Sequence, residues 1–411
     1  MPANIRKMLI AVAMIGTAPS AFADVITDWN EKAVAFVTPR MPPAAGQRVV
    51  AIMQVAMFDA VNSIERRYRP YLIQVTADAT ASKEAAAATA AGTVLAGLHP
   101  QSGAELRGAM SVYLAAIPNS DAKAEGIRLG ETVAGKILEA RAKDGADAPD
   151  SYRYKTRPGV YVPTPITVSS TWPNVKPFAL TSASQFRPEP PVALGSEQWA
   201  TDYNEIKEFG SKTSTKRSAR QTEDARFWLI TGPQSSEPLV RQIVAAKKMS
   251  LIDSARFMAL TAVAGADAGI AVFDAKYQYE FWRPITAIRN GDNDDNPATE
   301  RDATWQPIDN TPMHPEYPCA HCIISGAVAS AIEAALGTAD IPEVTMTSPT
   351  APGVTHRWTN IRAYNDEVSY ARIWAGFHYR FSVRVGQDMG RSIGQYVVKN
   401  VMQPVTTTGA R

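Results

Sequence analysis

Apolar positions recur every three to four residues along most of the chain, which is the spacing of one face of an α-helix. The run V-V-A-I-M-Q-V-A-M-F-D-A-V-N (49–62) is apolar almost all round and predicts a buried helix. Alternating stretches typical of strands are scarce. Further helices are predicted from residue 196 onward and over 82–98, 104–116, 122–143, 224–230, 237–249, 254–282, 323–336 and 361–398. The pattern therefore predicts an all-α protein.

One segment interrupts this helical pattern. Eight prolines lie between residues 157 and 191, a density that excludes an α-helix and predicts an extended segment. The segment also holds Trp172, so we expect it to pack on the helices. The chain is thus predicted to have an N-terminal helical half (24–150), a proline-rich crossing segment (151–195) and a C-terminal helical half (196–411).

Residues 1–23 have the pattern of a secretory signal peptide. Arg6 and Lys7 precede an apolar run over 8–18, and A-F-A (21–23) is a small-x-small cleavage site. The run is too short to span a bilayer comfortably, and we expect no transmembrane helix further along. The sequence predicts cleavage and export to the periplasm or the medium, without stable membrane insertion.

The charge balance argues against a polyanionic partner. The chain has 42 basic and 40 acidic residues, and removal of residues 1–23 would leave 40 of each. A molecule without net charge attracts nucleic acid or anionic lipid only weakly, so any anion site must be local. Four of the five histidines lie in the last hundred residues, where we expect the chemistry: His314, His321, His356 and His378.

The first candidate motif is K-Y-Q-Y-E-F-W-R-P (276–284). Seven helical residues turn about 700°, so Lys276 and Arg283 would share a face. Pro284 disfavours helical geometry at Arg283, so the helix is expected to end there and to project both cations from its last two turns. Two cations held together in a partly dry place are costly without an anion. A solvated basic face is the alternative.

The second motif is H-P-E-Y-P-C-A-H-C (314–322), followed at once by a helical pattern. Cys319, Ala320 and His321 are therefore expected at a helix N-terminus, where backbone N–H groups and the helix dipole favour an anion. A histidine beside that anion is well placed to transfer a proton. A histidine that only caps the helix is the alternative.

The third motif, A-R-I-W-A-G-F-H-Y-R, places Arg372 six residues before His378. On a straight helix the two side chains lie roughly 120° apart. They would reach one point only if the helix bends near Gly376 or if Arg372 uses its length. Taken alone, this spacing fits a core histidine.

Together the motifs Lys-x6-Arg-Pro, Pro-x-x-His and Arg-x5-His, in that order, resemble the signature of the vanadium haloperoxidases. The type-2 phosphatidic acid phosphatases and bacterial acid phosphatases share this signature. The stretches E-F-W-R-P, H-P-E-Y-P-C-A-H and R-I-W-A-G-F-H-Y-R-F are similar to the bacterial and fungal chloroperoxidase branch. The resemblance implies two packed four-helix bundles, in agreement with the all-α pattern.

By matching position, the resemblance implies a site for vanadate, or for phosphate as the alternative occupant. Lys276, Arg283 and Arg372 would hold its oxygens. The backbone N–H of Ala320 would bind another oxygen, and Cys319 stands where the family has an oxyanion-binding serine.

The resemblance also assigns roles to the histidines. His378 would be the axial ligand of vanadium, or the nucleophile of a phosphatase. His321 would be the acid–base residue, and His314 falls where bromide-oxidising members tend to carry histidine. The small-molecule partners would be hydrogen peroxide and a halide, or a phosphomonoester.

Two departures from the family pattern keep other functions open. Pro-Cys-Ala-His replaces Pro-Ser-Gly-His, so Cys319 would be a weaker donor and Ala320 adds a methyl group near the anion. Ser382 stands where the family often has an aspartate that raises the basicity of the ligand histidine. Cys319 and Cys322 could also pair in an oxidising compartment, although bridging one helical turn is awkward.

Three functions therefore stand as hypotheses. The leading one is a vanadium-dependent haloperoxidase that oxidises halide with hydrogen peroxide. The second is a phosphatase that works through a phosphohistidine. The third is a protein that binds phosphate or vanadate without turnover.

Overall fold

The computed structural model describes residues 24–163 and 166–405, so the expected signal peptide lies outside the described residues. The described part is mainly helical, as the sequence predicts. Its elements are α1 (Val25–Val37), α2 (Pro43–Glu65), α3 (Lys83–Leu98), α4 (Gly103–Ala115), α5 (Asp121–Arg141), α6 (Glu197–Phe209), α7 (Ala219–Phe227), α8 (Glu237–Ala246), α9 (Leu251–Tyr279), α10 (Pro284–Arg289), α11 (Ala320–Leu336), β1 (Asp340–Ser348), β2 (Ala351–Asn360), α12 (Ile361–Trp374) and α13 (Arg380–Asn400).

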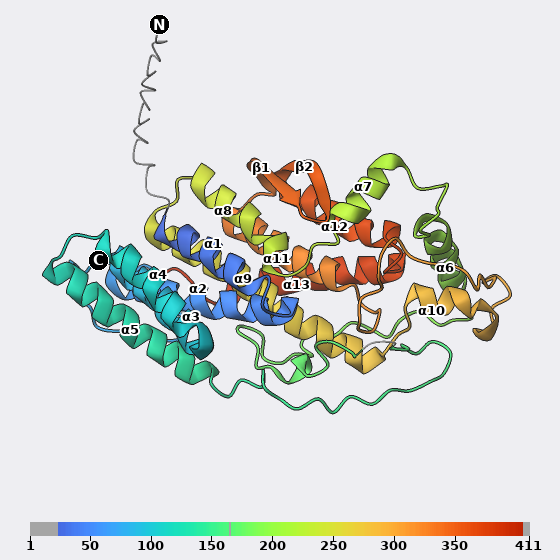
Figure 1. Cartoon of the computed structure of the whole chain (residues 1–411), viewed down its shortest axis with the longest axis horizontal. Helices are drawn as coiled ribbons and strands as arrows, with labels where there is room; N and C mark the ends of the chain where they lie inside the picture. The colour runs from blue at the N-terminus through green and yellow to red at the C-terminus, as the bar shows by residue number, and fades with distance from the viewer. Residues whose placement is uncertain (1–23, 164–165, 406–411) are drawn as a thin grey trace, which may run out of the picture.

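The helices share one continuous core. At one end α2, α3, α4 and α5 pack together, and at the other α9, α11, α12 and α13 do the same (Figure 1). The N-terminal helices and the C-terminal bundle meet where α2 lies against α9. Buried apolar side chains from both ends form a single cluster. The small sheet and α7 cover one side of the C-terminal bundle.

Glycines bring α13 very close to α11. A Cβ atom on Gly390 would lie 2.4 Å from the carbonyl oxygen of Ile323, and one on Gly394 would lie 2.3 Å from that of Ala327. These distances are far below van der Waals contact, so the two backbones touch because position 390 and position 394 lack side chains. The contact fixes α11 and α13 relative to each other.

The proline-rich segment packs on the helices, which confirms the expectation. Trp172 and Phe178 are buried. The carboxylate of Asp267, in the middle of α9, accepts hydrogen bonds from the backbone N–H groups of Phe178, Ala179 and Leu180 at 2.6, 2.7 and 3.0 Å. In Figure 1 the segment runs along one edge of the molecule, past the end of α9.

The region after α11 differs from the sequence prediction. An antiparallel hairpin, β1 and β2, precedes α12, with Val344 opposite Trp358 and Thr345 opposite Arg357. Val344 and Met346 point to the core while their neighbours do not, so the alternation is real but short. The single helix expected over 361–398 is two helices, α12 and α13, separated at residues 375–379.

One described helix, α9, is long and apolar enough to cross a membrane by length and composition. The sequence expectation that no later stretch would qualify is therefore wrong. However, 94% of its most apolar window is buried inside the structure. That degree of burial is what a central core helix has.

Candidate functional site

The first motif folds differently from the predicted single helix. α9 ends at Tyr279, because Glu280 adopts a left-handed conformation with φ of 50°. Arg283 is the N-cap residue of α10, and Pro284 begins that helix rather than stopping the previous one. Lys276 and Arg283 therefore come from two elements, although both are buried as a paired-cation site requires.

The two cations hold the start of the second motif. The Lys276 ammonium donates to the carbonyl oxygens of Pro315 and Glu316 at 2.8 and 2.7 Å. The Arg283 guanidinium donates through Nε to the carbonyl oxygen of His314 at 2.9 Å. Burial holds the pKa of Lys276 well below its usual range and lowers that of Arg283 to about 10.

The second motif begins a helix, as predicted. α11 starts at Ala320 with Cys319 as its N-cap residue. The Cys319 sulfur is bonded to that of Cys322, so the expectation of a weak thiol donor does not hold. The Cys319 side chain is buried against Val383 and Ile373.

The third motif turns sharply between two helices. α12 ends at Trp374, and Gly376 has a φ of +80°, which a residue with a side chain rarely adopts. His378 therefore lies in the turn before α13, where it faces the same space as Arg372. Of the two possibilities that the spacing left open, the structure shows a bend near Gly376, in the form of a helix break.

A cavity of about 510 Å³ collects most of the predicted residues. Its walls are largely apolar and come from α2, the crossing segment, the loop before α8, α9 and α12. The predicted site residues among its lining are His314, Ala320, His321, Arg372 and His378. We call this cavity the histidine chamber.

Arg283 lies directly behind the chamber. Its Nη1 is 3.2 Å from Nε2 of His378, and its Nη2 is 3.0 Å from Nδ1 of His314. Lys276 and Cys319 do not line the chamber either. The structure thus places Lys276 and Arg283 as supports of the chamber residues and leaves Cys319 out of contact with the cavity.

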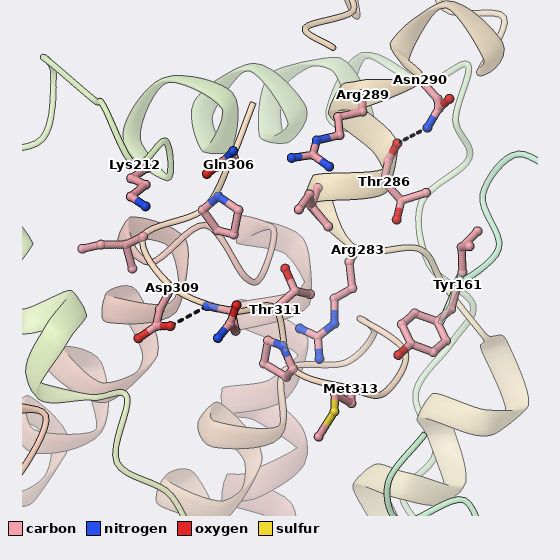
Figure 2. Close-up of a pocket in the computed structure, with 16 residues that line it drawn as sticks. Tyr161, Lys212, Arg283, Thr286, Arg289, Asn290, Gln306, Asp309, Thr311 and Met313 are labelled. Carbon is pink, nitrogen blue, oxygen red and sulfur yellow. Dashed lines mark hydrogen bonds between the residues drawn. The ribbon is translucent and has the colours of Figure 1, made fainter. Parts of the chain in front are cut away.

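A second, larger cavity of about 1080 Å³ reaches Arg283 from another side. Figure 2 shows its lining, in which Lys212, Arg289 and Gln306 are among the polar side chains. The loop over 309–313 lines both cavities. We call this larger cavity the outer pocket. The candidate site residue that lines it is Arg283.

Burial keeps the chamber histidines neutral. It holds the pKa of His378 well below the usual range, and the nearby charge of Arg283 adds to this effect. Burial and Arg372 do the same for His321. His321 Nε2 is 3.1 Å from the carbonyl oxygen of Ile230 and must donate to it, which leaves Nδ1 as the basic nitrogen. Neutral imidazoles can bind a metal centre or accept a proton.

Glu316 is a site residue that the sequence analysis missed. It is fully buried, and its Oε1 accepts a hydrogen bond from Nδ1 of His378 at 2.8 Å. Burial raises the pKa of Glu316 to about 7, while Lys276 and Arg283 oppose that rise. A signal was present, because a carboxylate inside the second motif coincides with the missing aspartate at Ser382.

Another cluster with metal-binding side chains lies outside the chamber. Glu223, Asp224 and His356 bring their ligand atoms within 4.8 Å of one another. However, the Arg220 guanidinium lies 2.9 Å from both acidic partners and 3.3 Å from Glu367, which also contacts His356. An arginine thus already supplies the cation that these carboxylates need, so we interpret the cluster as a structural network.

The chamber has the chemistry of an oxyanion site. Arg372 is buried, and its Nη1 donates to the carbonyl oxygen of Trp228 at 2.6 Å. Its Nε is buried with no hydrogen-bond partner among the described residues. A buried, charged donor without an acceptor is costly, and an oxyanion in the chamber would remove that cost. The residues present therefore fit vanadate or phosphate.

The C-terminal part of the chain matches a family model, described as the second helical-bundle domain of VCPO, over residues 256–407. This stretch contains all three motifs. Over this stretch the chain is similar to the class of vanadium haloperoxidases, as the three motifs predict.

Individual relatives agree with this class. Vanadium chloroperoxidase of Curvularia inaequalis is 31% identical over 186 residues, which cover 37% of this chain and 30% of that protein. A bacterial vanadium-dependent iodoperoxidase superimposes with a TM-score of 0.78 at 23% identity, over 93% of this chain and 96% of the other. A holo-type bacterial vanadium-dependent chloroperoxidase gives 0.72 at 16% identity, over 89% and 93%. The structural matches show the shared fold.

Proposed function

We propose that the protein is a vanadate-dependent haloperoxidase, which oxidises a halide with hydrogen peroxide. The observation that carries this proposal is the buried, partly unpaired Arg372 guanidinium facing His378 across one chamber. Arg283 adds positive charge close by, and the buried carboxylate beside His378 is Glu316. Such a site favours a small oxyanion over a neutral ligand.

Each chamber residue has a role in this proposal. Arg372 and the Ala320 N–H would hold the vanadate oxygens, and His378 Nε2 would be the nitrogen ligand. His321 would take up and return a proton at Nδ1. Bound vanadate would supply activation of peroxide toward halide without a change of its oxidation state. His314 lies on the chamber wall, where it could meet the halide.

The test is bromination of monochlorodimedone by protein loaded with orthovanadate, with bromide and hydrogen peroxide supplied. Wild-type protein should brominate only when vanadate is present. The His378→Ala variant should lose both activity and vanadate binding by calorimetry, because it lacks the nitrogen ligand. Vanadate binding of unchanged affinity in that variant would refute the assignment.

A phosphatase remains the second candidate, favoured by the hydrogen bond between Glu316 and His378. A phosphohistidine route needs a carboxylate behind its nucleophile, and Ser382 cannot supply one. Glu316 can. Release of p-nitrophenol from p-nitrophenyl phosphate without vanadate would support this candidate. If neither reaction occurs but phosphate raises the melting temperature, the protein binds oxyanions without turnover.

We also propose export. The signal-like pattern of residues 1–23 and the Cys319–Cys322 disulfide support it, since disulfides persist in oxidising compartments. Amino-terminal sequencing of protein recovered outside the bacterial cytoplasm should start at Asp24. Recovery only inside the cell, with Met1 retained, would count against export.

A further inference from the structure

The carboxylate partner of His378 does not come from the sequence position at which the family often has it. The position four residues after His378, where the family often has aspartate, is Ser382. Glu316, 62 residues earlier in the chain, supplies a carboxylate instead and accepts from Nδ1 of His378 at 2.8 Å. The same oxygen also accepts from the backbone N–H of Tyr379 at 3.2 Å. Both contacts are buried.

Two neighbours of His378 select the same tautomer. Glu316 accepts, so Nδ1 carries the proton. Arg283 can only donate, and its Nη1 lies 3.2 Å from Nε2, so Nε2 must present its lone pair. Nε2 is therefore the nitrogen without a proton, and Arg283 is its neighbour in this structure. That state is required of a metal ligand or of a nucleophile.

Glu316 is itself held from several sides. Its carbonyl oxygen accepts from Lys276 at 2.7 Å, and its N–H donates to the carbonyl oxygen of Phe281 at 2.8 Å. Its Oε2 and the hydroxyl of Ser382 are both buried and have no hydrogen-bond partner among the described residues, and the nearby Ser382 hydroxyl lowers the pKa of Glu316. Ser382 is smaller than aspartate and thus leaves room for the Glu316 side chain. Glu316 then supplies the carboxylate that an aspartate at position 382 would otherwise supply.

We propose that Glu316 is the positioning residue that fixes the His378 tautomer, and that positions 316 and 382 are alternative sources of this carboxylate. This inference rests on the proposed function, because it assumes that His378 Nε2 meets an oxyanion. It predicts that the carboxylate can be moved from one position to the other.

The experiment compares wild type with Glu316→Gln, Ser382→Asp and the double variant Glu316→Gln/Ser382→Asp. Glutamine keeps the shape of the side chain and removes its charge. Orthovanadate affinity is measured by calorimetry. The His378 tautomer is read from ¹⁵N NMR of protein labelled at histidine, with the signal assigned by its loss in His378→Ala. The matched control is Glu333→Gln, at the far end of α11.

We expect Glu316→Gln to weaken vanadate binding at least tenfold and to reduce the population of the Nδ1–H tautomer. The double variant should recover most of the affinity and the wild-type tautomer, which a merely structural role would not produce. Glu333→Gln should change neither. Unchanged affinity and tautomer in Glu316→Gln, or a double variant no better than Glu316→Gln, would overturn the proposal.

Two further outcomes remain informative. If Glu316→Gln fails to fold, Ser382→Asp alone decides, because a second carboxylate beside Glu316 should weaken vanadate binding by repulsion. Unchanged binding in that variant would overturn the proposal. If wild-type protein binds no vanadate, the proposed function fails, while the NMR tautomer in Glu316→Gln still confirms or refutes the role of Glu316.

Discussion

His321 occupies the second position of α11 and lines the chamber, where the charge of Arg372 acts on it. Because Nε2 donates to the carbonyl oxygen of Ile230, only Nδ1 can exchange a proton with a bound oxyanion. The side chain makes no other hydrogen bond among the described residues. Its role in the proposed reaction is therefore proton transfer and not anion binding.

This role predicts a separation of binding from turnover. His321→Ala should keep vanadate affinity within about threefold of wild type and lower the bromination rate by ~10²–10⁴, the usual contribution of a general acid–base residue. His99→Ala is the matched control, since His99 is a buried histidine packed on Phe36 away from the chamber. Retained turnover in His321→Ala would exclude the assigned role.

At the scale of single residues, the sequence predicted which side chains belong to the candidate site better than it predicted their contacts. The order and spacing of the three motifs were enough to predict that His321, Arg372 and His378 lie near one another, because this combination of motifs is specific. They did not pair Glu316 with His378, because that hydrogen bond joins two segments 62 residues apart. The pairing of Cys319 with Cys322 was likewise only one of two states that the spacing allowed.

Among the elements, α11 and α13 fix the positions of two chamber histidines. α11 begins beside His321, and α13 begins two residues after His378. The backbones touch at Gly390, where a Cβ would lie 2.4 Å from the carbonyl oxygen of Ile323. A methyl group there must push the two helices apart.

Gly390→Ala should therefore lower the free energy of unfolding by ~1–3 kcal/mol, the usual cost of overpacking. The matched control is Gly135→Ala in α5, where an added Cβ would meet nothing within 4 Å. That change should raise stability by ~0.5–1 kcal/mol, because alanine is the better helix former. Urea denaturation measures both, and equal effects in the two variants would contradict the close contact.

Helix ends explain most differences between the predicted and observed elements. Proline at position 284 was expected to stop a helix, but proline is equally suited to the first helical position. The actual stop is Glu280 in a left-handed conformation, which no local rule assigns to glutamate. The hairpin over 340–360 was missed because its burial alternates over too few residues.

At the scale of the whole molecule, a buried carboxylate links the N-terminal helices to α8. Glu237 accepts from Asn30 of α1 at 2.7 Å, and burial raises its pKa from 4.5 to about 7. Between these values the folded state binds the proton more tightly than the unfolded state. The contribution of Glu237 to stability therefore falls as pH rises from 4.5 to 7 and stays low above 7.

Glu237→Gln removes this titration and keeps an acceptor for Asn30. The difference in the free energy of unfolding between the variant and wild type should therefore shift in favour of the variant from pH 5 to pH 8, by up to ~3 kcal/mol. Urea denaturation at the two pH values measures the gain. Asn30→Ala serves as the control, because losing the hydrogen bond should cost stability at both values. A difference from wild type that is the same at pH 5 and pH 8 would rule out this linkage.

The backbone contact between α11 and α13 has a consequence for how such a protein can diverge. His321 lies on α11 and His378 lies directly before α13, and these two helices cannot slide past each other, whereas much of the chamber wall comes from loops and from the start of α2. Wall positions such as Pro43, Val168 and Leu229 can thus be exchanged without disturbing the reactive floor. A mutant library restricted to those positions should change which organic molecules the chamber admits, while the reactive residues stay the same.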